Sequence, residues 1–284
     1  MRTAFVGLGV MGAPMAGHLA RAGHAVTVFN RSPEKAARWV EAHGGRAAAS
    51  VADAVAGAEM IALCVGNDDD VRGVVSVALP ATQAGAIFVD HTTTSAKLAR
   101  ELAALCAGQG RVFLDAPVSG GEAGAKSGQL SVMVGGDAAA VARVEPVLAA
   151  YAKAVRRIGE AGSGQLAKMV NQICIAGVVQ GLAEGVAFAR AAGLDSDLVL
   201  QAISQGAAQS WQMDNRWRTM ARGEFEFGFA VDWMRKDLGL VLDEARANGA
   251  RVEVTALVDQ FYAEVRSMGG ARWDTSSLAA RLLR

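Results

Sequence analysis

The feature that most restricts the fold of this chain is a glycine-rich turn that directly follows the apolar run Ala4–Val6 and opens a helical pattern. In a strand–turn–helix unit, Gly7 permits the tight turn, Gly9 lets the main chain approach a pyrophosphate, and Gly12 lets the helix pack against the strand. Free N–H groups at the helix start attract phosphate oxygens. The pattern therefore favours a dinucleotide site over an empty glycine turn, without separating nicotinamide from flavin. The predicted cofactor contacts in this turn are Gly7, Leu8, Gly9, Val10, Met11 and Gly12.

Short apolar runs rich in Val, Ile and Phe alternate with helical patterns through residues 1–162. Segments such as Pro33–Ala42 and Ala96–Ala107 have helical character and separate most of the runs. This alternation is typical of βαβ units, and right-handed crossovers make a doubly wound, mainly parallel sheet the simplest topology. We therefore predict an α/β fold whose first domain, residues 1–162, is a Rossmann-type dinucleotide-binding domain. The predicted strands are Ala4–Val6, Ala25–Phe29, Met60–Val65, Ala86–Asp90, Val112–Asp115 and Leu130–Val134.

The pattern changes in the second part of the chain, where apolar residues recur at helical spacing from Gly164 to Ala192 without a proline. Ser163 is a suitable N-cap and Gly193 a suitable terminator. Polar side chains interrupt the apolar stretch, so we expect a buried helix and not a membrane span. Residues 163–284 are therefore predicted to form an all-helical C-terminal domain on a long connecting helix. The later predicted helices are Asp197–Ser204, Gln212–Ala221, Val231–Ala247 and Val254–Met268.

The end of the second predicted strand bears on the choice of cofactor. NAD-selective sites usually place an acidic residue there to bind the ribose 2′-hydroxyl, whereas this chain has Asn30, Arg31 and Ser32. Arg31 is suited to pair with a 2′-phosphate, and its two neighbours are suited to donate hydrogen bonds. The alternative is a solvated loop cation beside Glu34. We predict NADP as the preferred cofactor, with NAD as a possible one.

Two further segments are candidates for substrate chemistry. In the turn after the strand that ends at Asp115, Ser119 is followed by Gly120 and Gly121, which gives a donor-rich loop suited to a carboxylate or simply a tight turn. At the start of the long helix, Lys168 and Asn171 lie three residues apart and share one face. A lysine whose ammonium reaches solvent near a helix end is the alternative for this pair.

Four segments in this order and spacing resemble the β-hydroxyacid dehydrogenase family, which includes 3-hydroxyisobutyrate dehydrogenase and the glyoxylate and succinic semialdehyde reductases. The resemblance covers essentially the whole chain. The segments are GLGVMGAPMAGHLARAGH, DAPVSGG, GQLAKMVNQ and WMRKDLGLVLDEA.

The resemblance implies a role for each matching residue. Lys168 matches the catalytic acid/base of the family, and Asn171 matches the residue that orients the substrate. The segment Ser119–Gly121 matches the part that holds the substrate carboxylate. Lys236 matches a lysine at the nicotinamide end of the site, and Thr93 matches a threonine that contacts the cofactor.

Three stretches depart from the family pattern. Gln172 stands where the family often has a second asparagine. The segment 65–70 replaces a proline-containing loop of some members, and residues 210–214 match no substrate signature. Lys236 also has an alternative as an exposed helix pair with Asp232.

Charge and cysteine content exclude several other classes. Lysine plus arginine equals aspartate plus glutamate at 28 each, so the chain has no basic field for nucleic acid or an anionic membrane. The three cysteines lack redox or zinc-ligand spacing, which favours a reducing, cytoplasmic location. The four histidines join no catalytic or metal-like cluster, and His91 is expected to be a turn residue with at most a minor cofactor contact.

The function predicted from these features is hydride transfer between NADP(H) or NAD(H) and a small 3-hydroxy acid or semialdehyde acid. Lys168 would donate a proton in reduction and accept one in oxidation. Two alternatives remain: an imine or general carbonyl reductase of the same fold, and a non-catalytic dinucleotide-binding module. The long apolar helix also predicts self-association as a dimer or tetramer through the helical domains.

Overall fold

The computed structural model describes residues 1–283, which form two compact units divided between Lys168 and Met169. Each unit has its own hydrophobic core. The division falls inside one long helix, a few residues after the predicted domain boundary at residue 162.

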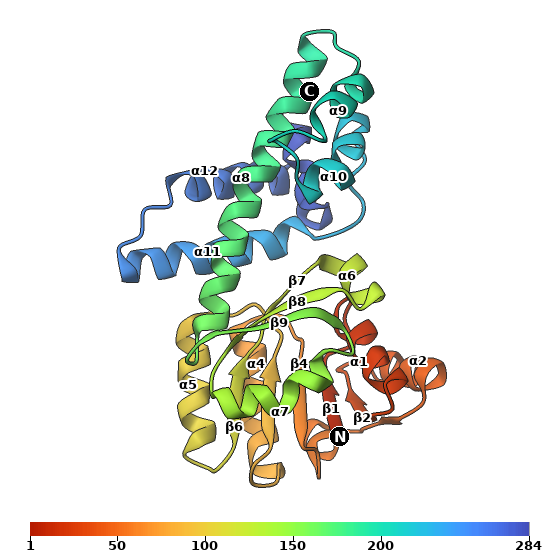
Figure 1. Cartoon of the computed structure of the whole chain (residues 1–284), viewed down its shortest axis with the longest axis vertical. Helices are drawn as coiled ribbons and strands as arrows, with labels where there is room; N and C mark the ends of the chain where they lie inside the picture. The colour runs from red at the N-terminus through yellow and green to blue at the C-terminus, as the bar shows by residue number, and fades with distance from the viewer. Residues whose placement is uncertain (284) are drawn as a thin grey trace. The chain divides into compact units, whose positions relative to one another are not determined.

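The first unit is built on one nine-stranded sheet with the strand order β3-β2-β1-β4-β5-β6-β8-β7, in which β9 pairs with β8 (Figure 1). The first six strands in this order are parallel to one another. This is the order of a doubly wound dinucleotide-binding domain, so the predicted Rossmann-type fold is confirmed. The strands are β1 (Arg2–Val6), β2 (Ala25–Phe29), β3 (Arg46–Ala47), β4 (Met60–Leu63), β5 (Ile87–Asp90), β6 (Val112–Asp115), β7 (Val118–Ser119), β8 (Leu130–Gly135) and β9 (Ala152–Gly159).

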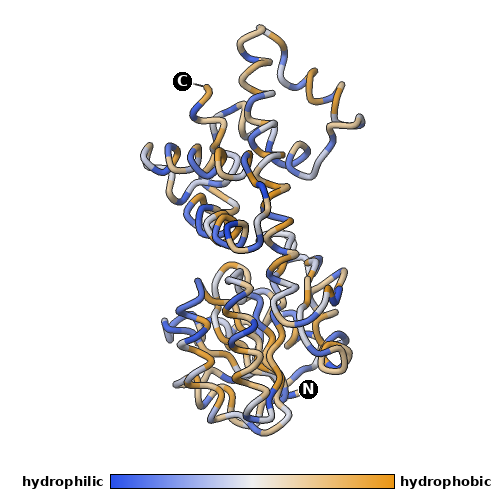
Figure 2. Tube along the Cα trace, turned by 90° about the vertical axis from the view of Figure 1, so that its left-hand side faces the viewer, coloured by the Kyte–Doolittle hydropathy of each residue, from blue (hydrophilic) through white to orange (hydrophobic). Residues whose placement is uncertain are grey.

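Helices cover both faces of this sheet, and separate apolar clusters fill the space on its two sides. All side chains of β4 and β5 are buried, as expected for central parallel strands. Figure 2 shows the apolar residues concentrated in the interior of the unit, with hydrophilic residues on the outer helices. The helices are α1 (Gly12–Arg21), α2 (Pro33–His43), α3 (Val51–Val55), α4 (Asp68–Ala78), α5 (Ala96–Ala107), α6 (Gly121–Ser127), α7 (Ala138–Leu148) and the 3-10 helix η1 (Leu79–Ala81).

Three strands were not predicted, namely β3, β7 and β9. The strand β9 pairs only with β8, and it carries the charged residues Lys153, Arg156 and Arg157. A partly exposed edge strand of this kind lacks the apolar run that identified the central strands. The sheet is also mixed, because β8 runs antiparallel to both β6 and β7.

The second unit is helical, and no strand occurs between residues 169 and 283 apart from an isolated bridge that joins Ala230 and Asp274. Gly193 has a φ of 68° directly after the long helix, which confirms it as the terminator. The helices are α8 (Ser163–Ala191, which begins in the first unit), α9 (Ser196–Ile203), α10 (Trp211–Arg222), α11 (Val231–Asn248), α12 (Glu253–Ser267), η2 (Gly270–Arg272) and η3 (Thr275–Arg281).

Helix α8 is long and apolar enough to span a membrane by length and composition alone, and 44% of its most apolar window is buried within the protein. Ala176, Val179 and Ala183 pack in the core of the second unit. On other faces, the side chains of Val178 and Phe188 are 38% and 73% exposed. The helix is therefore only half-buried, whereas the sequence predicted a buried one.

Candidate functional site

The glycine-rich turn has the steric requirements of a dinucleotide cradle. Gly7 has a φ of 99°, and a Cβ on it would lie 2.2 Å from the carbonyl oxygen of Cys64. A Cβ on Gly12 would lie 2.0 Å from the carbonyl oxygen of Gly7, whereas no atom lies within 4 Å of the Cβ position of Gly9. The N-cap residue Met11 makes no side-chain cap to helix α1. Gly9 thus faces open space beside uncapped helical N–H groups, which fits a pyrophosphate.

Asn30, which directly follows β2, forms a hydrogen bond to the glycine-rich turn. The main-chain N–H of Leu8 donates to Oδ1 of Asn30 at 3.0 Å, and Nδ2 of Asn30 donates to the carbonyl oxygen of Ser32 at 3.2 Å. Arg31 is 85% exposed and forms an ion pair with Asp70 at 3.4 Å. Asn30 therefore fixes the glycine-rich turn, and Arg31 pairs with a carboxylate of α4 and not with Glu34.

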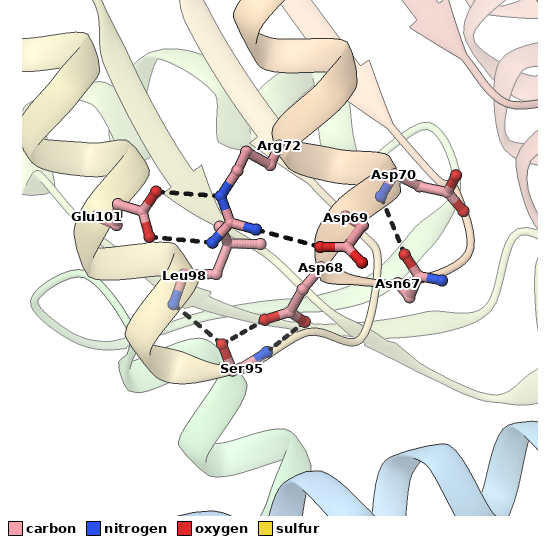
Figure 3. Close-up of polar contacts among 8 residues, drawn as sticks. All are labelled: Asn67, Asp68, Asp69, Asp70, Arg72, Ser95, Leu98 and Glu101. Carbon is pink, nitrogen blue, oxygen red and sulfur yellow. Dashed lines mark hydrogen bonds and ion pairs between the residues drawn. The ribbon is translucent and has the colours of Figure 1, made fainter.

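The acidic residues Asp68–Asp70 belong to the segment 65–70, which replaces a proline-containing loop of some family members. Their contacts join the loop after β4 to the turn after β5, at the carboxyl ends of these strands (Figure 3). Both the N–H and the Oγ of Ser95 donate to the carboxylate of Asp68, at 3.0 and 2.5 Å. One turn further along α4, Arg72 binds both carboxylate oxygens of Glu101 on α5. These contacts hold the loop after β4 against the turn after β5, which contains Thr93.

Gln165, a residue with no predicted role, holds the turn around Thr93. Its side chain is fully buried. Its Nε2 donates to the carbonyl oxygen of Thr92 at 2.8 Å, and its Oε1 accepts the N–H of Thr94 at 3.1 Å. Both ends of one amide are thus bonded to the residues that flank Thr93, which joins the first turn of α8 to the carboxyl end of β5.

Asp115 fixes the start of α8 from the neighbouring strand. Its buried carboxylate accepts the N–H groups of Gly162 at 2.8 Å and Gln165 at 2.9 Å. Burial raises the pKa of this carboxyl, and the main-chain N–H bonds act in the opposite direction. A Cβ on Gly164 would lie 2.6 Å from the carbonyl oxygen of Asp115. Asp115, and not the predicted Ser163, therefore caps the helix that carries Lys168.

Lys168 and the turn Ser119–Gly121 belong to this same unit. Lys168 is only 8% exposed, so its side chain does not extend into solvent as the alternative interpretation required. Ser119 lies in β7 opposite Ser131 of β8. Gly120 and Gly121 have φ values of 133° and 60°, which a residue with a side chain rarely adopts. The turn is thus one that only glycine adopts without strain.

His91 lies in the loop directly after β5, as expected, and it is buried there. Its Nδ1 donates to the carbonyl oxygen of Ala116 at 2.7 Å, and its Nε2 accepts the hydroxyl of Tyr151 at 2.8 Å. Burial lowers the pKa of His91 to about 4, so the ring is neutral at physiological pH. His91 therefore holds the segment that leads into the turn containing Ser119.

The second unit contains a chain of polar side chains that includes two of the predicted site residues. Nδ2 of Asn171 donates to Oε1 of Gln172 at 2.7 Å, and Nε2 of Gln172 donates to Oδ2 of Asp237 at 2.7 Å. The ammonium of Lys236 lies 3.1 Å from Oδ1 of Asp237. Asp232, the alternative partner of Lys236, pairs with Arg266 at 3.0 Å.

The structure thus groups the predicted residues into two sets. The glycine-rich turn, Arg31, Thr93, the turn Ser119–Gly121 and Lys168 lie in the first unit, whereas Asn171 and Lys236 lie in the second. Asp115, Gln165 and Asp237 were not predicted as site residues, although all three lie inside the segments that carried the family resemblance. The contacts of the predicted residues in both sets to cofactor and substrate remain predictions.

Two family models match this chain over nearly its whole length. The NAD-binding domain of 6-phosphogluconate dehydrogenase matches residues 2–159. The NAD-binding domain of NADP-dependent 3-hydroxyisobutyrate dehydrogenase matches residues 162–282.

Individual relatives agree with these matches. An uncharacterised oxidoreductase of Shewanella frigidimarina is 60% identical over 99% of this chain and 98% of its own length. A probable 3-hydroxyisobutyrate dehydrogenase-like protein of Arabidopsis thaliana is 39% identical over 99% of this chain and 84% of its own length. The structure of Mycobacterium tuberculosis 3-hydroxyisobutyrate dehydrogenase with L-serine has a TM-score of 0.90 and 34% identity, and covers 100% of both chains.

Proposed function

Because the chain belongs to the β-hydroxyacid dehydrogenase family and is an NAD(P)-dependent 3-hydroxyacid dehydrogenase, we propose that Lys168 is its acid/base and that its substrate is a small 3-hydroxy acid or semialdehyde acid. The observation that carries this proposal is the burial of Lys168 on a helix whose first turn is bonded to the ends of two strands. A lysine that is buried at the ends of parallel strands in a dinucleotide-binding domain is a candidate for proton transfer.

The nicotinamide cofactor, when bound, supplies or accepts the hydride. In reduction, the Nζ of Lys168 donates a proton to the carbonyl oxygen of the substrate as the alkoxide forms. In oxidation, the neutral amine accepts the hydroxyl proton.

The substrate carboxylate is held, in this proposal, by the turn Ser119–Gly121 with Lys236 as a second cation. Asn171 orients the reacting group. L-serine, present in the Mycobacterium tuberculosis structure, is itself a small 3-hydroxy acid with a carboxylate, which supports a substrate of this class. The positive φ values of Gly120 and Gly121 give this turn a main-chain conformation that few other residues adopt, and main-chain N–H groups in such turns are suited to an anion.

NADP is the proposed preferred cofactor, with NAD as a poorer one. Arg31 stands where NAD-selective sites carry an acidic side chain, and its 85% exposed guanidinium would exchange its ion pair with Asp70 for a 2′-phosphate. The family model that matches the second part of the chain is that of an NADP-dependent enzyme. Direct binding of NADPH and NADH, followed by fluorescence, tests this preference.

Self-association through the helical unit is also proposed. Phe188 on α8 is 73% exposed, and Leu194 and Leu198 just after it are 52% and 64% exposed. Apolar side chains gathered in this way usually mark an interface. Light scattering at micromolar concentration should give a dimer or tetramer, and a stable monomer would contradict the proposal.

The experiment that tests the proposed reaction compares semialdehyde acids with their methyl esters, with uncharged aldehydes and with cyclic imines, using each cofactor and the nicotinamide absorbance. The acids should be the preferred substrates, and Ser119→Ala and Lys236→Ala should lower kcat/KM for the acids while changing the neutral analogues little. Equal rates on acids and neutral analogues in the unmodified protein would instead indicate a general carbonyl or imine reductase.

A further inference from the structure

We propose that Gln172 is a positioning residue, which transmits the orientation of the buried Asp237 carboxylate to the amide of Asn171. The inference rests on the proposed role of Asn171 in orienting the substrate. Gln172 stands where the family often has an asparagine, and its side chain is one methylene longer. It is 3% exposed and Asp237 is 2% exposed, so both lie away from solvent.

The contacts form a chain from α11 to α8. Oδ2 of Asp237 accepts a hydrogen bond from Nε2 of Gln172 at 2.7 Å, and Oε1 of Gln172 accepts one from Nδ2 of Asn171 at 2.7 Å. Nε2 of Gln172 also lies 3.6 Å from the sulfur of Met234. The Gln172 amide therefore has an acceptor on its nitrogen side and a donor on its oxygen side.

The carboxylate decides which way each amide in this chain faces. An ionised carboxylate only accepts hydrogen bonds, so the nitrogen of the Gln172 amide must face Asp237. The oxygen of Gln172 then faces Asn171, and only the nitrogen of the Asn171 amide makes a favourable contact with it. A reversed Asn171 would place two carbonyl oxygens against each other at about 2.7 Å. The nitrogen side of the Asn171 amide is thus fixed toward Gln172, and its Oδ1 is fixed away from it.

This orientation has a chemical consequence for the proposed reaction. An amide that presents Oδ1 accepts a hydrogen bond, which suits a hydroxyl or an ammonium and disfavours a carbonyl oxygen or a carboxylate. Asp237 binds Lys236 through its other oxygen at 3.1 Å. One buried carboxylate therefore contacts Lys236 directly and is linked to Asn171 through Gln172.

The first test removes the side-chain amide of Gln172 and compares the effect with the same substitution at Gln180. Gln180 lies on the same helix, is 7% exposed and donates to Glu184 at 2.7 Å, but no predicted site residue belongs to its contacts. Gln172→Leu should lower kcat/KM about ten- to a hundredfold, which is the effect of losing a hydrogen bond to a charged group. Gln180→Leu should change kcat/KM less than about twofold. Equal losses in the two variants would overturn the proposal.

A double-mutant cycle tests whether Gln172 acts through Asn171. In an Asn171→Ala background, adding Gln172→Leu should lower kcat/KM by less than about threefold, because the orientation that Gln172 enforces no longer matters. Multiplicative losses in the double variant would show that Gln172 acts by another route, such as the position of Lys236, and would overturn the assignment.

A pH profile supplies a readout that a purely structural role would not change. In Gln172→Glu the new carboxyl donates to Asp237 only while it is protonated, and its pKa should be raised by burial and by the neighbouring negative charge. The charged groups near it are Asp237 and Lys236 on α11 and Lys168 one turn earlier on α8. The activity of this variant relative to the unmodified protein should therefore rise as pH falls from about 8 to about 5.5. Gln180→Glu should show a flat ratio, and a flat ratio for both would count against the proposal.

A spectroscopic measurement separates this inference from the proposed function. The side-chain amide resonance of Asn171, assigned by its loss in Asn171→Asp, should shift in Gln172→Leu and stay unchanged in Gln180→Leu. If the protein reduces no carbonyl acid with either cofactor, the proposed function fails, while this shift still tests the hydrogen-bonded chain. If the protein is active and the resonance does not move, only the inference about Gln172 fails.

Discussion

The two sets of candidate residues are held in place by different kinds of contact. In the first unit, Asp115 binds main-chain N–H groups, and Gln165 binds the main chain on either side of Thr93. In the second unit, Asn171 and Lys236 are held by the side chains of Gln172 and Asp237.

This difference indicates how each part of the site depends on the fold. Main-chain groups at the carboxyl ends of parallel strands are positioned by the sheet itself, so the contacts that shape the first part also stabilise the domain. Side-chain contacts between two helices can be removed one at a time by substitutions that leave the main-chain hydrogen bonds of both helices intact. Substitutions in the first part should therefore lower stability and activity together, and those in the second part should lower activity more than stability.

The largest expected effect is on turnover and tests whether Lys168 belongs to the chemistry rather than to this framework. Lys168→Ala should lower kcat by a hundredfold or more, as expected for the loss of a general acid. The affinity for NADPH, measured by fluorescence titration, should barely change. A variant with near-normal turnover would make Lys168 a structural residue of the first unit.

The next effect is on stability and tests the main-chain packing at the start of α8. In Gly164→Ala, the new Cβ would lie 2.5 Å from the carbonyl oxygen of Met133 and 2.6 Å from that of Asp115. We expect the free energy of unfolding in urea to fall by about 1–3 kcal/mol, with loss of activity. Gly181→Ala on the same helix is the control, because no atom lies within 4 Å of its Cβ position. It should gain roughly 0.5–1 kcal/mol. Equal stability of the two variants would contradict the tight packing inferred at Gly164.

The pH dependence of the unfolding free energy tests a buried contact of the first unit, that of His91. Its folded pKa of about 4 lies below the ordinary value of 6.5, so the folded state binds fewer protons than the unfolded state. Its contribution is complete above about pH 6.5 and is lost as pH falls toward about 4, with a loss of about 2 kcal/mol at pH 5. His91→Gln keeps a donor and an acceptor without titrating. Its stability should therefore fall less than that of the unmodified protein between pH 7 and pH 5, and parallel curves would refute the assignment.

The smallest expected effect concerns cofactor choice at an exposed position that neither set of buried contacts restrains. Arg31→Asp should weaken NADPH binding at least about tenfold and NADH binding much less. Asp70→Asn removes the carboxylate that pairs with Arg31 at 3.4 Å, and it should strengthen NADPH binding a few-fold.

The neighbouring substitution Asp69→Asn is the control for this measurement. It removes the same charge from a side chain that is 96% exposed and pairs with Arg72. Equal losses for both cofactors in Arg31→Asp would show that Arg31 does not bind the 2′-phosphate. Equal changes in Asp69→Asn and Asp70→Asn would show only a general charge effect.

The sequence predicted the elements whose patterns are local. The glycine-rich turn, the six apolar strands and the four later helices could be recognised because apolar periodicity and glycine positions record them directly. The two-residue strands β3 and β7 are too short to show a pattern, and the charged edge strand β9 lacks the apolar run that marks a central strand. The burial of α8 was overestimated, since composition does not indicate which faces of an apolar helix meet a core.

The sequence by itself thus determined the fold class, the family and the segments that carry the candidate site, because these follow from spacing within short stretches. Only the tertiary structure decided the partners of each polar side chain. Asp115 reaches the start of α8 across 47 residues of sequence, and Gln172 reaches Asp237 across 65. Such contacts form because an unpaired polar group is costly to bury, so burial favours a partner in space whatever its distance along the chain.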